Sequence, residues 1–142
     1  MEAYDAGGGA TARLANVSAR SAVGTGSGIL IAGFVVNDGA CTILVRGVGP
    51  GLAPFNVPGA LGDPQLQIFR EAQLVAENND WGSASNSAAL MTTAQAVGAF
   101  ALPGGSRDAA LLITLPQGAY TAQVSGVNST TGVALVEVYE VP

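Results

Sequence analysis

Short apolar runs separated by Gly, Pro and Asn recur along this chain of 142 residues, and they constrain its fold more than any other feature. In residues 116–126 the apolar Tyr120, Ala122 and Val124 alternate with polar side chains, as in a strand with one buried face. Several such runs at short spacing are typical of sandwiches and barrels. The sequence therefore predicts an all-β fold, an antiparallel β-sandwich of eight or nine strands. The clearest strand-like segments are 12–19, 29–37, 41–47, 66–70, 74–78, 109–115, 116–126 and 133–141.

Two hairpins are predicted within this pattern. Residues 29–37 are apolar at both odd and even positions, which predicts a central strand covered on both faces. The tight turn "DGA" at 38–40 predicts that residues 41–47 return beside that strand. A second hairpin is predicted between residues 66–70 and 74–78, around "EAQ".

Two segments interrupt the strands. Residues 47–64 are rich in Gly and Pro, which disfavour both ladders and helices, so we expect a loop that packs on the domain. An Ala-rich stretch follows later in the chain and predicts one short helix or helical turn near residues 85–97. Ser85 or Asn86 is suited to cap that helix at its N-terminus.

Composition excludes several functional classes. The net charge is −5, and the five cations are scattered arginines, so we expect no nucleic-acid partner. The chain has no Lys and no His, which removes the common general bases and predicts that it is not an enzyme. The single cysteine, Cys41, reads as a small buried hydrophobe. The apolar runs are too short for membrane insertion, and no signal peptide is recognisable in these residues, so the leader of an exported protein is expected to lie outside them.

The two ends of the chain resemble each other. "EAYD" at residues 2–5 matches "EVYE" at 137–140 in the positions of its Glu and Tyr. In each copy the Glu and the Tyr share one strand face. A single domain has room for one such strand, and residues 133–141 are the longer and more apolar candidate. We therefore expect residues 1–10 to be a strand-like segment on a Gly-rich tether, and residues 11–142 to be the sandwich domain.

The N-terminal segment is thus the predicted assembly element, with Glu2, Ala3, Tyr4 and Asp5 as its residues. It is expected to be disordered or to pair with an exposed sheet edge of another copy. Pairing of that kind could propagate from copy to copy into a fibre.

Two stretches resemble a known bacterial module. "DPQLQIFR" at 63–70 leads through "LVAENNDWG" at 74–82 to "LLITLPQGAYTAQVSG" at 111–126. This order resembles pre-peptidase C-terminal type domains, in which a strand pair is followed by an Asn/Asp loop and a Pro-x-Gly-x-Tyr hairpin. The resemblance implies a jelly-roll-like sandwich.

A second resemblance covers nearly the whole chain. "IAGFVV" at 31–36, "ILVRGVGPGLAPFNVPGALGDPQL" at 43–66 and the two echoing ends look like the repeated extracellular modules of large Verrucomicrobia-type surface proteins. In that family, units join through a segment similar to "ALVEVYEV" at 134–141 followed by "EAYDAGGGATARLANVS" at 2–18. The resemblance implies an extracellular or cell-surface location and a structural role, and it brings no catalytic motif.

Asn78, Asn79 and Asp80 form the best candidate for a metal site. Their oxygens are hard ligands in a turn, as calcium requires, and Asp63 or Asp108 could complete the coordination. The alternative is a turn in which Asn and Asp bond their own backbone. We expect no obligate cofactor, with calcium as the ion that would suit this loop.

Trp81 and Tyr120 are the aromatic residues with candidate roles. Trp81 could stack on a sugar ring beside the 77–80 loop, or it could bury its large ring at the core edge. Tyr120 follows the turn set by Pro116 and Gly118, and a buried ring with its hydroxyl bonded to nearby backbone would pin that corner.

These features predict a non-enzymatic structural module of an extracellular bacterial surface protein, fibre or filament. Its partners would be other copies of itself or neighbouring like modules, joined by strand addition or head-to-tail contacts. The alternative is a carbohydrate-binding module that uses Trp81 and the 77–80 loop to bind glycans. A third reading is an appendage of an exported hydrolase.

Overall fold

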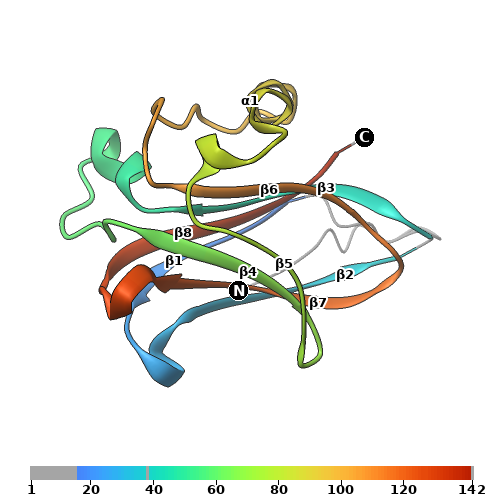
Figure 1. Cartoon of the computed structure of the whole chain (residues 1–142), viewed down its shortest axis with the longest axis horizontal. Helices are drawn as coiled ribbons and strands as arrows, with labels where there is room; N and C mark the ends of the chain where they lie inside the picture. Colours follow the sequence, from blue (N-terminus) through green and yellow to red (C-terminus); the bar gives the residue numbers. More distant parts are fainter. Residues whose placement is uncertain (1–15, 38, 142) are drawn as a thin grey trace.

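The computed structural model describes residues 16–37 and 39–141. Two antiparallel four-stranded sheets pack face to face (Figure 1). Sheet A has the order β1-β8-β3-β6, and sheet B has the order β2-β7-β4-β5. The predicted antiparallel β-sandwich is therefore confirmed, with eight strands. They are β1 (Asn16–Val23), β2 (Leu30–Val36), β3 (Cys41–Val48), β4 (Pro64–Arg70), β5 (Gln73–Asn78), β6 (Ala109–Leu115), β7 (Gly118–Gly126) and β8 (Gly132–Glu140).

The topology is that of one long hairpin folded over on itself. β1 pairs with β8, β2 with β7, β3 with β6 and β4 with β5. Every connection crosses from one sheet to the other except the β4–β5 turn. This is the jelly-roll arrangement of a double-sheet sandwich.

The predicted hairpin of residues 29–37 with 41–47 is wrong. β2 pairs with β7 in sheet B, whereas β3 lies between β8 and β6 in sheet A. The turn after β2 therefore carries the chain between the sheets. A tight turn fixes only a local reversal, and the wider packing of the chain selects each strand's partner.

The expectation that this strand is central and covered on both faces is also wrong. β2 is an edge strand whose burial alternates, and Ile31 and Val35 on its outer face are 52% and 42% exposed. The second predicted hairpin, by contrast, is present as β4 and β5.

The main core lies between the sheets and follows the period-two alternation of the strands. Side chains of β2, β7 and β8 that point inward are almost fully buried there. They include Ala32, Phe34 and Val36 of β2, Tyr120, Ala122 and Val124 of β7, and Ala134, Val136 and Val138 of β8.

A smaller core lies on the outer face of sheet A. The helix α1 (Ser87–Ala96) and a short helical turn at Trp81–Ser83 cover this face near β3 and β6 (Figure 1). Leu90 and Ala94 of α1 belong to the same buried cluster as Leu44. The short helix predicted near residues 85–97 is thus confirmed. No helix in the described ranges is long and apolar enough to cross a membrane.

Candidate functional site

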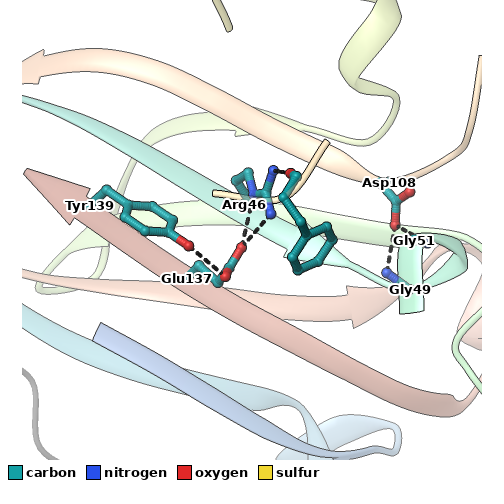
Figure 2. Close-up of polar contacts among 7 residues, drawn as sticks. Arg46, Gly49, Gly51, Asp108, Glu137 and Tyr139 are labelled. Carbon is teal, nitrogen blue, oxygen red and sulfur yellow. Dashed lines mark hydrogen bonds and ion pairs between the residues drawn. The ribbon is translucent and has the colours of Figure 1, made fainter. Parts of the chain in front are cut away.

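An ion pair occupies the outer face of sheet A, where α1 and the chain after it cover the strands. Arg46 on β3 and Glu137 on β8 are directly opposite in the strand register. The Arg46 Nε donates a hydrogen bond of 2.8 Å to Glu137 Oε1, and Nη2 lies 2.7 Å from the same oxygen (Figure 2). The two side chains are 1% and 8% exposed, so water screens the pair very little.

Arg46 also contacts Phe100, in the segment that follows α1. Its Nη1 donates a 2.6 Å hydrogen bond to the Phe100 carbonyl oxygen, and its guanidinium lies 4.5 Å from the centre of the Phe100 ring. The guanidinium therefore ties the segment after α1 to the sheet. A planar, delocalised cation suits both contacts, which lysine could not reproduce.

Tyr139 completes this network on β8. Its hydroxyl donates a 2.7 Å hydrogen bond to Glu137 Oε2, so both carboxylate oxygens have a partner (Figure 2). Burial raises the pKa of the Tyr139 phenol, and the hydrogen bond to Glu137 with the negative charge of that carboxylate raises it further. We call Arg46, Glu137, Tyr139 and Phe100 the β3–β8 network. Apart from Arg46 Nη2, its polar side-chain atoms are hydrogen-bonded within the protein, which is the behaviour of a structural element.

Asp108, directly before β6, is a fully buried acidic residue. Its Oδ1 accepts hydrogen bonds from the backbone N–H groups of Gly49 (2.7 Å) and Gly51 (3.0 Å), as Figure 2 shows. Its Oδ2 accepts a 2.6 Å bond from the Ser106 hydroxyl. The carboxylate therefore anchors the Gly-rich loop that begins after β3, and its oxygens are engaged in that task.

The candidate calcium ligands Asn78, Asn79 and Asp80 lie at the end of β5 and just after it, and the Asn78 side chain uses its polar groups within the protein. Asn78 Nδ2 donates to the Asp80 carbonyl oxygen (3.2 Å), while its Oδ1 accepts from the Ala110 N–H (3.1 Å). The Asp80 carbonyl oxygen also accepts from Ser83. No cluster of three or more Cys, Asp and Glu side chains suited to a metal ion occurs in the part of the chain that the structure describes.

Trp81 is 6% exposed and belongs to the small core under α1. Its indole Nε1 donates to the Pro103 carbonyl oxygen and to Ser106 Oγ, each at 3.3 Å. The ring is therefore buried, and the stacking surface for a sugar that the sequence suggests is not presented to bulk solvent.

Tyr120 lies at the corner between β6 and β7. It is 3% exposed, and its hydroxyl donates a 2.6 Å hydrogen bond to the Pro116 carbonyl oxygen. Its ring stacks on Phe34 with centroids 5.6 Å apart. Arg70 packs beside it, and a Cβ added at Gly118 would lie 2.9 Å from Arg70 Nη2, so the Arg70 side chain would have to shift.

The predicted assembly residues Glu2, Ala3, Tyr4 and Asp5 lie outside the described residues. The similar "EVYE" segment at residues 137–140, the echo of residues 2–5, lies in β8, which runs between β1 and β3 in sheet A. The Glu and Tyr of that echo are Glu137 and Tyr139 of the β3–β8 network. The similarity of the two chain ends indicates this Glu–Tyr pair, but it does not indicate the partner Arg46. The sequence marks Arg46 only as a single charged residue in the apolar run "TILVRGV".

Comparisons of the chain with protein-family models, with curated proteins and with solved structures find no match. The fold and its contacts therefore carry the functional interpretation.

Proposed function

We propose that the chain is a non-enzymatic structural module of an extracellular bacterial surface protein, fibre or filament, and that copies join by strand addition at the free edge of β2. The buried charged groups support a structural role. The charged side chains of Arg46, Glu137 and Asp108 form ion-pair and hydrogen-bond contacts that join strands and loops. The edge of β2 is the observation that carries the proposed mode of assembly.

The sandwich has four edge strands, and two of them are obstructed. On β6, the outward N–H of Ala110 is bonded to the Asn78 side chain, and the carbonyl of Leu112 accepts from Asn86 Nδ2 at 3.3 Å. On β5, the pairing with β4 shifts register after Ile68, which leaves an extra residue that distorts the strand. Capped backbone groups and bulges are devices that protect sheet edges from other chains.

The remaining edges, β1 and β2, differ in their side chains. β1 carries the exposed Arg20 at its middle, and a charge on an edge opposes pairing. β2 reads "LIAGFVV", with no charge and no Pro over seven residues. Among the described residues β2 pairs with β7 alone. An uncharged edge that no other described strand covers is the one most ready to accept another strand.

The outer face of β2 suits the proposed donor. Ile31 and Val35 are exposed there, two positions either side of Gly33. A strand formed by residues 2–5 of another copy would place Tyr4 on one face and Ala3 on the other. Pairs between an aromatic and a β-branched residue on neighbouring strands stabilise sheets. Because the donor and the acceptor are different parts of the chain, the contact would repeat in one direction and build a fibre.

Sedimentation velocity over a range of concentrations tests this proposal. The full chain should form oligomers larger than a dimer, and both deletion of residues 1–9 and Ile31→Lys should leave monomers. Leu74→Lys is the matched control, because Leu74 is also an exposed apolar residue, at 42% against 52% for Ile31, on the opposite edge strand β5. A full chain that stays monomeric throughout, or a control that disrupts assembly as much as Ile31→Lys, would contradict the proposal.

A further inference from the structure

A small cavity lies between α1 and the outer face of sheet A. Its volume is about 110 Å³, and its lining is mostly apolar, with Leu44, Trp81, Leu90 and Ala94 among the wall residues. An apolar cavity of roughly 150 Å³ in another protein holds benzene, so this one suits a ligand of about that size or slightly smaller. The half-exposed Met91 of α1 stands at its rim.

One wall of the cavity is polar. Arg46 lines it, and Arg46 is 1% exposed. The Arg46 Nη2 is close enough to Glu137 for an ion pair, yet its N–H bonds are not aligned on any acceptor among the described residues. A buried donor without an acceptor costs free energy, so a cavity beside it favours a ligand that brings one.

The charge around this donor restricts the ligand further. Glu137 already balances the positive charge of Arg46 at 2.7 Å. A charged ligand would add an uncompensated charge to an apolar space, which is unfavourable. Apart from Gln95 at the α1 side, the remaining walls offer mainly apolar contact. The site therefore fits a neutral molecule with a compact apolar body and a single acceptor group.

We infer that the cavity under α1 is a binding site for a small neutral carbonyl compound, whose oxygen accepts from Arg46 and whose apolar body packs against Trp81 and Leu90. This inference is independent of strand addition, because β2 lies in the other sheet. It assigns α1 and its connections a role beyond covering sheet A.

Trp81 provides a direct readout, since it is the one tryptophan of the chain and it lines the cavity. Cyclopentanone is the probe, and methylcyclopentane is its apolar counterpart of nearly equal shape. In proton–nitrogen correlation spectra of the full chain, cyclopentanone should shift the single indole signal saturably. Relative to the transfer of each compound from water into an alkane, the ketone should bind at least several-fold more favourably than the hydrocarbon, because only the ketone has an acceptor.

Two variants test whether the cavity is the site. Ala94→Leu fills it from α1, and Ala99→Leu fills it from the segment that follows, so either should weaken binding tenfold or more. Ala96→Leu is the matched control, because Ala96 is exposed on the same helix. Should one filling variant fail to fold, the other still decides the question.

Three results would overturn the inference. They are an indole signal that does not shift saturably with the ketone, no preference for the ketone over the hydrocarbon once their transfer from water is subtracted, and equal weakening by Ala96→Leu and a filling variant. The second result would show an apolar void in which Arg46 takes no part.

Discussion

Arg46 and Glu137 face each other across β3 and β8, 91 residues apart in sequence, and form a buried ion pair with a 2.8 Å hydrogen bond. The pair joins the middle of sheet A to the segment after α1, because Arg46 also bonds the Phe100 carbonyl. The ion pair therefore helps to hold β3 and β8 in register.

Replacing one partner of the ion pair should be much worse than replacing both. Glu137→Leu leaves the Arg46 charge buried without compensation, which should lower the free energy of unfolding by about 3–5 kcal/mol. Arg46→Met combined with Glu137→Leu removes both charges, so the double variant should be more stable than Glu137→Leu alone. Urea unfolding of the single and double variants gives the comparison. A double variant less stable than Glu137→Leu would show that the uncompensated Arg46 charge is not what destabilises the single variant.

Tyr139 should make stability depend on pH in the alkaline range. Its pKa is raised in the folded protein, chiefly by burial and then by Glu137. Folding therefore favours the neutral phenol, and this contribution is fully present below the pKa of an unfolded tyrosine, about 10. It is lost as the pH rises above that value towards the higher folded pKa. The free energy of unfolding should thus fall between about pH 9 and pH 12.

Tyr139→Phe is the control for this pH dependence. The variant lacks the ionising hydroxyl, so part of the alkaline decline should disappear in urea unfolding measured at several pH values. An identical decline in both proteins would mean that other groups cause it.

Asp108 should be essential for the Gly-rich loop after β3. Asp108→Ala leaves the N–H groups of Gly49 and Gly51 buried without acceptors, which should cost about 3 kcal/mol or more. Asp108→Asn retains one oxygen for these donors and should cost about 1 kcal/mol. Thermal unfolding of both variants measures the difference. Equal losses would indicate that charge matters more than the two hydrogen bonds.

Calcium should leave the melting temperature unchanged. Asn78 already bonds the Ala110 N–H and the Asp80 carbonyl oxygen, so it would have to give up these contacts to bind an ion. Differential scanning calorimetry with calcium, and with magnesium as the control, tests this. A calcium-specific rise that Asn78→Ala abolishes would instead establish the loop as a metal site.

Local patterns in the sequence predict most of the fold. The alternation in residues 116–126 gives the buried face of β7, and the Ala-rich stretch gives α1. The partner of β2 was mispredicted because a tight turn is compatible with both a hairpin and a crossing between sheets. Its apolar outer face, read as buried, is exposed at Ile31 and Val35. A local sequence pattern does not specify which strands pair with each other in a sheet.

The polar contacts were harder to predict for the same reason. Tyr120 bonds Pro116, only four residues away, and this contact can be anticipated from the corner sequence. Arg46 and Glu137 come together only through the jelly-roll topology, which no local pattern specifies. For Trp81 the sequence left exposed and buried readings open, because a lone aromatic after a turn suits either.

Hydrogen exchange at β2 is the most direct test of strand addition. The amides of β2 that do not bond β7 should exchange fast in dilute protein, since this edge is open. At concentrations where sedimentation shows oligomers, the same amides should become protected, while exchange at β5 stays unchanged. Assembly that leaves the outer amides of β2 as unprotected as in the dilute protein would contradict the proposed role of this edge.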